Sequence, residues 1–145
     1  MTSERIEKVI NLKSFTKEQL ELEAKKRREE LRIENEKLEN LENLFNETIN
    51  KFSEKQNSGH LNTKEISLFY DYISYMERRI KEQKKVVHKT RELLLEKERE
   101  VMKAHREKRL LEILHDSAIK EEMKEALARE QKDLDLDFLM RRLRE

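Results

Sequence analysis

Four histidines are the side chains of this sequence best suited to bind a metal or to exchange protons near neutral pH. They are His60, His88, His105 and His115, and none lies three or four residues from another, as metal-binding pairs on one helix do. The chain has no cysteine, which excludes disulfides and thiolate metal sites. Its single glycine excludes a glycine-rich phosphate-binding loop. We therefore expect no metal site and no cofactor.

Carboxylates are far more numerous, since Asp and Glu make up 32 of the 145 residues. Carboxylates that act as catalytic acids or bases usually lie in an enclosed pocket, where burial or a nearby charge shifts the pKa. In a chain with 45% charged residues, most carboxylates must face water instead. The serines stand in no recognisable nucleophile–base arrangement. We therefore expect that this protein is not an enzyme.

Basic side chains gather at three places, within residues 25–28, 103–109 and 141–144. A nucleic-acid-binding protein needs a strongly basic face. The net charge of the whole chain is only +1. We therefore interpret the basic clusters as solvated helix surfaces and expect no nucleic-acid partner. DNA binding that falls steeply with salt would favour the opposite interpretation.

All three tyrosines, Tyr70, Tyr72 and Tyr75, lie beside Phe69 within a stretch of seven residues. If the positions that face inward are 66, 69, 73 and 76, the tyrosines point sideways or outward. Exposed aromatic side chains are enriched where proteins bind one another. The pattern equally allows rings that lie along the seam between two helices and cover the neighbouring helix.

The element that carries the tyrosines is predicted by a row of apolar residues at intervals of seven. The row consists of Ile66, Ile73, Ile80, Val87, Leu94 and Val101. Such a repeat in a chain with one glycine and no proline is typical of a coiled coil. Disordered chains share the high charge but lack the apolar periodicity. The fold class is therefore predicted to be all-α.

One strong turn signal, in residues 56–63, divides the chain. It contains the single glycine, and Asn62 followed by Glu65 is typical of a helix N-cap. A short turn makes two helices antiparallel neighbours. We predict helix one over about 3–57, the turn over about 57–62 and a longer helix two over about 63–142.

The turn also predicts which residues face each other. Folding the chain about residue 59 pairs positions whose numbers sum to about 119. In this register the acidic residues 34–47 of helix one face the basic residues 72–85 of helix two, and opposite charges support the pairing. The whole chain, 1–145, would then be a single unit, an antiparallel two-helix coiled-coil hairpin.

The same register leaves the end of helix two without a partner. Helix one begins near residue 3, which pairs with about residue 116, so residues 119–145 overhang as a single helix. A bare apolar stripe of this kind usually marks an interface. A further short contact with helix one and a partly frayed tail are the alternatives. The stripe consists of Ile119, Met123, Leu127, Leu134 and Phe138.

Two stretches of this chain resemble the FliJ family, small coiled-coil components of the flagellar type III export apparatus. Residues 70–83 resemble the start of that family's second helix, which is rich in aromatic residues and continues as Y-x-x-φ-x-x-φ-E-x-x-I-x-x-Q (φ is apolar). Residues 127–135 are similar to the family's E-Q-K-x-φ-D-E signature, and a basic end follows. Length, two-helix layout and turn position also agree. Leu136 is a departure, because the family usually has an acidic residue there.

The resemblance implies a fold similar to the central stalk of rotary ATPases, and it implies partners. These are the hexameric export ATPase, the transmembrane export gate and export chaperones. Taken with the surface pattern, it suggests gate contacts at Tyr72, Tyr75, Arg79 and Gln83. It suggests contacts with the ATPase ring at Glu130, Gln131, Lys132, Leu134, Asp135 and Phe138.

The function expected from this resemblance is that of a non-enzymatic stalk and coupling protein, chaperone-like, in flagellar protein export. The protein would be a monomeric hairpin in the cytoplasm, associated with the inner face of the cell membrane through the export apparatus. No apolar run approaches the roughly 20 residues that span a bilayer, so we expect no direct membrane insertion. Two alternatives remain: the equivalent stalk of a virulence secretion system, and a coiled-coil scaffold that forms homodimers through helix two.

Overall fold

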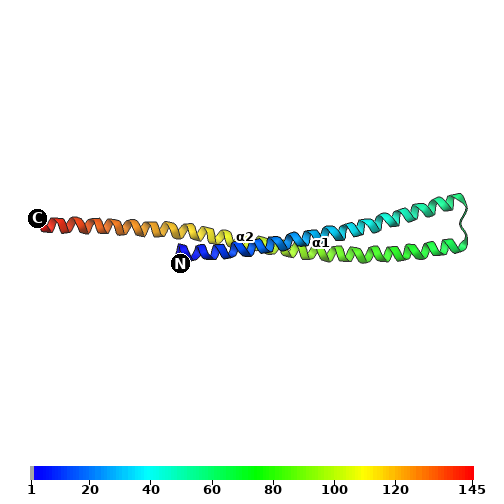
Figure 1. The fold of residues 1–145 in the computed structure, drawn as a ribbon, viewed down its shortest axis with the longest axis horizontal. Coiled ribbons are helices and arrows are strands. Elements are labelled where there is room, and N and C mark those ends of the chain that lie inside the picture. The colour runs from blue at the N-terminus through cyan, green and yellow to red at the C-terminus, as the bar shows by residue number, and fades with distance from the viewer. Residues whose placement is uncertain (1) are drawn as a thin grey trace. The chain divides into compact units, whose positions relative to one another are not determined.

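The computed structural model describes residues 2–145, which form two helices joined by a short turn (Figure 1). Helix α1 spans Ser3–Ser58 and helix α2 spans Thr63–Arg144. The all-α hairpin with a longer second helix is therefore confirmed. Each helix ends within two residues of its predicted end.

The turn depends on two residues that permit a helix to stop and another to start. Gly59 has a φ of 72°, in the left-handed region that glycine adopts at little cost, and its N–H donates to the carbonyl of Gln56 at 3.2 Å. The Asn62 side chain then accepts a hydrogen bond from the N–H of Glu65 at 2.9 Å. This is the predicted N-cap of α2, and it satisfies one of the four N–H groups that the first turn leaves free.

Contacts along the hairpin fall into two compact units. Unit 2 is the continuous stretch Leu20–Glu100, which includes the turn, and unit 1 combines Met1–Gln19 with Val101–Glu145. The two units are described separately below. The prediction that residues 1–145 form a single unit stays a prediction.

The core of unit 2 is a single thin seam between the two helices. Ala24, Met76, Val87 and Leu94 are buried, with exposed fractions of 0%, 1%, 5% and 8%. The predicted apolar row therefore lies in the seam at Val87 and Leu94. It does not extend to Ile66, which is 37% exposed beside the turn.

The facing residues of unit 2 confirm the predicted register. Gln83 bonds to Glu34, Lys97 lies 2.9 Å from Glu23, and Arg28 lies 3.5 Å from Glu98. The residue numbers in these pairs sum to between 117 and 126, close to the predicted 119.

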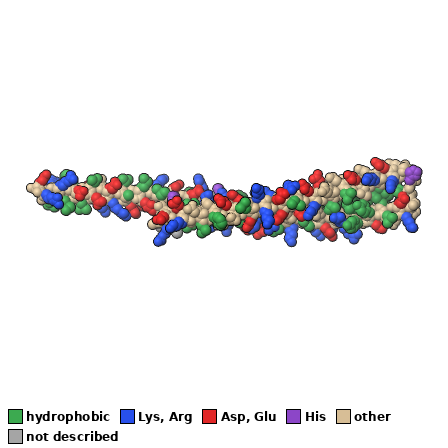
Figure 2. Space-filling view, viewed as in Figure 1, with side chains coloured by type: hydrophobic (Ala, Val, Ile, Leu, Met, Phe, Trp, Pro, Cys, Tyr) green, Lys and Arg blue, Asp and Glu red, His purple; other side chains and the backbone are tan. Residues whose placement is uncertain are grey.

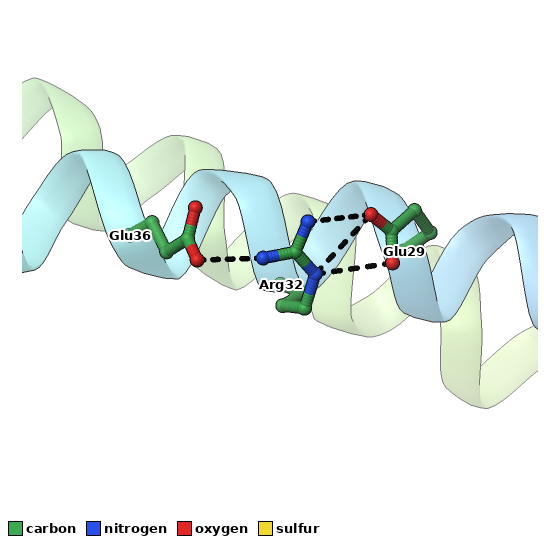
Figure 3. Close-up of polar contacts among 3 residues, drawn as sticks. All are labelled: Glu29, Arg32 and Glu36. Atoms are coloured by element: carbon green, nitrogen blue, oxygen red, sulfur yellow. Dashed lines mark hydrogen bonds and ion pairs between the residues drawn. The ribbon is translucent and has the colours of Figure 1, made fainter.

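Two of the carboxylates that we expected to face basic residues of α2 pair with cations of α1 instead. On α1, Glu34 lies 3.2 Å from Lys37. Glu36 lies 2.6 Å from Arg32 on the same helix (Figure 3). Partners three or four residues away on the same helix are neighbours whatever the other helix does. Glu36 therefore pairs within α1, whereas Glu34 also accepts a hydrogen bond from Gln83 of α2.

Unit 1 is built on a smaller seam. Ile6 and Ala104 are buried, at 5% and 6% exposure. An ion pair of 2.7 Å between Lys13 and Glu107 crosses between the two helices. The N–H and the hydroxyl of Ser3 both donate to the Glu122 carboxylate, at 2.9 and 2.7 Å. These hydrogen bonds mark where the start of α1 meets α2.

Candidate partner-binding sites

A stack of aromatic rings joins the two helices beside the turn. Phe52 of α1 lies against Phe69 of α2, with ring centroids 3.5 Å apart and planes only 6° from parallel. The Tyr70 ring meets both edge-on, at 6.3 Å from Phe52 and 5.9 Å from Phe69. Tyr70 therefore partly covers the seam, although it remains 61% exposed.

The other two tyrosines form an exposed row along α2. Tyr72 and Tyr75 are 39% and 47% exposed, and their ring centroids lie 6.4 Å apart. The guanidinium of Arg79 lies 5.8 Å from the centroid of the Tyr75 ring, within the range of a cation–π contact. The outward orientation that the sequence allowed is confirmed for Tyr72 and Tyr75. Together with Arg79 they form one surface. These are three of the four residues predicted to bind the gate.

Gln83, the fourth of these residues, has a different environment. It is half-buried, and its amide nitrogen donates to the Glu34 carbonyl at 2.9 Å and to the Glu34 carboxylate at 2.7 Å. The hydrogen bonds from Gln83 and then Lys37 hold the pKa of Glu34 below its ordinary value. The amide nitrogen of Gln83 is therefore engaged within the hairpin, while Tyr72, Tyr75 and Arg79 face outward.

An apolar groove beside the turn was not predicted from the sequence. Tyr72 forms part of its lining and links it to the tyrosine row. Leu68, 68% exposed, lies at its edge, outside the positions that the seven-residue repeat singles out. Figure 2 shows hydrophobic side chains gathered near the turn end of the hairpin. The groove residues include Thr48, Lys51, Phe52, Leu61, Leu68, Phe69 and Tyr72.

The far end of α2 is a bare helix. The chain remains helical to Arg144, and every residue of 119–145 is exposed. The hydrogen bonds from Ser3 reach Glu122, so the uncovered stretch starts a few residues later than predicted. Among the described residues, 126–145 have no hydrogen bond, ion pair or groove shared with α1.

The six residues predicted to bind the ATPase ring all lie on this bare stretch. Leu134 and Phe138 are 65% and 64% exposed, and they are four residues apart, so they share one side of the helix. The Gln131 amide nitrogen donates to the Asp135 carboxylate at 3.4 Å, along the helix surface. The other two, Glu130 and Lys132, are exposed as well.

A second apolar face near the C-terminus escaped the sequence analysis. Its members are spaced i, i+3, i+4 and i+7, which places them together on one side of a helix. That side lies roughly opposite Leu134 and Phe138. The spacing alone is the signal that would have found it. The face consists of Leu136, Leu139, Met140 and Leu143, which are 57%, 53%, 55% and 86% exposed.

The described residues contain neither a metal-binding cluster nor a helix that could span a membrane. Within residues 2–145, no group of three or more His, Cys, Asp or Glu side chains is arranged to hold a metal ion. Neither described helix contains a stretch apolar and long enough to cross a membrane.

Comparison with known proteins gave one match. The family described as "Flagellar FliJ protein" matches residues 2–144, almost the whole chain. No curated protein and no solved structure matches the sequence.

Proposed function

Since the chain belongs to the FliJ family and is thus a component of the flagellar export apparatus, we propose that it is the apparatus's stalk and coupling protein. In this role it is not an enzyme. It docks on the export ATPase ring through the end of α2 and on the transmembrane export gate through the tyrosine row. The observation that carries the proposal is the bare helical stretch 126–144, with its exposed apolar side chains, beyond the paired part of the hairpin.

The ATPase ring is the proposed partner of this bare stretch. Exposed Leu134 and Phe138 would each contribute about 1.5–3 kcal/mol if fully buried in a complex. Polar neighbours on the same helix would determine orientation and register. The proposed contacts are Glu130, Gln131, Lys132, Leu134, Asp135 and Phe138.

The export gate is the proposed partner of the tyrosine row. Tyr72, Tyr75 and Arg79 are residue types that dominate protein interfaces, and here they already contact one another before binding. The proposal also includes Gln83. Its amide nitrogen donates to Glu34, and its side-chain carbonyl oxygen is the acceptor proposed to bind the partner. The groove beside the turn continues this surface through Tyr72.

The remaining expectations follow from this role. The free protein would be a monomeric hairpin in the cytoplasm, held peripherally at the inner face of the cell membrane by the apparatus. Export chaperones are further proposed partners. A role in a virulence secretion system is the nearest alternative, and a homodimeric scaffold is another, which the mass in solution would reveal.

The experiment that tests the proposal is ATP hydrolysis by the cognate flagellar ATPase, with the full chain and with a version that ends at Glu125. This version keeps Glu122 and its bonds to Ser3, so the paired part of the hairpin is unchanged. We expect the full chain to stimulate hydrolysis and ring formation, and the shortened chain to do neither. No effect of the full chain would contradict the proposal.

A further inference from the structure

Helix α1 carries an exposed face outside both proposed docking sites. A shallow groove on it is lined by residues of α1 alone, and we call this the Leu22–Ile33 face. Leu22 and Ile33 are 61% and 39% exposed. The residues of the face are Leu22, Lys25, Lys26, Arg28, Glu29, Glu30, Arg32 and Ile33.

The two apolar side chains of this face are aligned. Eleven residues separate Leu22 from Ile33, which is three turns of helix and about 16 Å along the axis. Lys26 and Glu29 lie between them on the same side, because their spacing follows the i, i+4, i+7 and i+11 positions. A single exposed leucine needs no explanation, whereas an aligned pair that brackets charged groups has the form of a helix-docking surface.

The carboxylates of the face are already paired. Arg32 bonds to Glu29 at 2.6 Å and to Glu36 at 2.6 Å, so one guanidinium holds two carboxylates (Figure 3). Arg27 similarly holds Glu30 at 3.1 Å. These are charge-assisted bonds between neighbours on one helix, and they neutralise the acidic groups of the face in place.

The two lysines are left with uncompensated charge. Within residues 2–145, neither Lys25 nor Lys26 forms an ion pair. The two other cations of the face are paired, since Arg28 lies 3.5 Å from Glu98 and Arg32 bonds to Glu29 and Glu36. The face thus presents two ammonium groups between and beside two apolar side chains. A ligand that matches it must bring negative charge to the middle and apolar groups to both ends.

We propose that the Leu22–Ile33 face binds an acidic amphipathic helix of a partner protein, with two apolar side chains about eleven residues apart and carboxylates between them. Such a helix buries Leu22 and Ile33 and places its carboxylates at Lys25 and Lys26. Nucleic acid fits less well, because its phosphates would match the two lysines but bring no apolar side chain to Leu22 or Ile33. The inference is independent of the stalk proposal, since it involves neither the tyrosine row nor residues 126–144.

The test uses the full chain with a photo-crosslinking benzoylphenylalanine in place of Leu22, expressed in flagellated cells. Cross-linked products are identified by mass spectrometry, and the linked segment is located in the partner. We expect a segment with the acidic, apolar pattern stated above. The corresponding synthetic peptide is then titrated against the full chain by fluorescence anisotropy.

Charge reversal provides the decisive comparison. Lys25→Glu/Lys26→Glu should weaken peptide binding about tenfold, as expected for two exposed ion pairs. Lys84→Glu/Lys85→Glu, the same change on α2, should leave binding unchanged. Replacing the facing carboxylates of the peptide by lysine should restore binding to the reversed chain. Lys25→Ala/Lys26→Ala, with helicity checked by circular dichroism, separates lost attraction from a disturbed helix and should weaken binding less.

Several results would overturn the inference. These are no cross-link at Leu22, a linked segment without the stated pattern, or peptide binding that ignores charge reversal. Binding of the full chain to phosphatidylglycerol vesicles or to duplex DNA, abolished by Lys25→Glu/Lys26→Glu, would assign the face to lipid or nucleic acid instead. Stimulation of the ATPase should be the same in all of these variants, which keeps this test separate from that of the stalk proposal.

Discussion

At the scale of single residues, the tyrosine row links local structure to the proposed gate contact. Replacing Tyr72 and Tyr75 together by alanine should weaken binding to the gate by a few kcal/mol at most, because two interfacial rings are lost. The helices should be unaffected, because both rings are exposed and alanine favours helix. Binding of the purified gate domain and circular dichroism would measure the two effects. Val86→Ala, a 43% exposed site on the same helix, is the control. Unchanged binding in the double variant would refute the gate assignment.

Gln83 makes a residue-scale prediction about stability. Its amide nitrogen donates two hydrogen bonds across the seam to Glu34. Gln83→Ala should lower the free energy of unfolding by about 1 kcal/mol, the usual net contribution of such bonds. Urea unfolding followed by circular dichroism would measure it. Gln131→Ala, which removes only a 3.4 Å bond on the exposed surface, should change stability far less. Equal effects of the two substitutions would show that the Gln83–Glu34 hydrogen bonds add no more to the free energy of unfolding than a bond on the exposed surface.

Residue-scale features differed in how well the sequence predicted them. Local chemistry sufficed for Asn62 and Gly59, because a cap and a left-handed turn depend on neighbours within a few positions. The link from Gln83 to Glu34 was missed because it depends on side-chain placement across the seam, which residue type alone does not determine. The roles of Tyr72 and Tyr75 remain predictions, although their exposure is established.

At the scale of the elements, the two helices are held by a seam only one side chain thick. Met76 is the largest fully buried side chain of the described residues, so truncating it leaves a cavity in the seam. Met76→Ala should lower the free energy of unfolding by about 2–3 kcal/mol. Met102→Ala, at 56% exposure on the same helix, should change it by less than about 0.5 kcal/mol. Chemical denaturation would compare them, and similar losses would mean that the seam does not carry the stability.

The pairing of the chain ends in unit 1 should depend on pH. Hydrogen bonds from the Ser3 N–H and hydroxyl lower the pKa of Glu122 below its ordinary value near 4.5, and the hydrogen bond from Lys13 does the same for Glu107. A carboxyl with a lowered pKa in the folded state stabilises that state above the ordinary value. The contribution is lost as the pH falls through the folded-state pKa. The melting temperature should therefore drop as the pH is lowered from about 5 towards 3.

Substitution of Glu122 tests this explanation. Glu122→Gln should lower the melting temperature at neutral pH and make its fall in acid shallower, because one of the titrating groups is gone. Glu121→Gln removes the same charge one residue earlier, away from the Ser3 hydrogen bonds, and serves as the control. Identical pH profiles for Glu122→Gln and the unaltered chain would show that the Ser3 contact contributes nothing.

Element boundaries and register were predictable because each repeats its signal many times along a helix. The seven-residue apolar row, the lone turn signal and the cap together predicted both helices and their antiparallel pairing. Individual ion pairs were not predictable. Glu36 pairs with Arg32 on its own helix, whereas Glu34 contacts both Lys37 on its own helix and Gln83 on the other, and periodicity does not predict which partner forms. Ile66 likewise shows that a position in the seven-residue repeat need not be buried, since it is 37% exposed.

At the scale of the whole molecule, the chain devotes little of its length to a core and much to surface. Six apolar side chains of the described residues are buried, whereas large apolar side chains are exposed along both helices. A protein of this kind acts through the partner proteins that bind those exposed side chains. The stalk proposal requires that nothing covers them in the free protein, so sedimentation should give the monomer mass of 17.8 kDa. A stable dimer would favour the homodimeric scaffold.

The two opposite apolar faces at the end of α2 give the most discriminating prediction at this scale. A helix enclosed by a ring contacts protein on all sides, whereas a helix in a one-sided groove leaves one face in water. Leu134→Ser/Phe138→Ser and Leu139→Ser/Leu143→Ser change matched pairs, each four residues apart, on roughly opposite sides. If the ring encloses this end, each pair should raise the concentration needed for half-maximal ATPase stimulation at least tenfold, because each lost anchor costs about 1.5 kcal/mol or more. Circular dichroism would verify that both variants stay helical. A loss confined to one pair would place the helix in a one-sided groove and contradict enclosure.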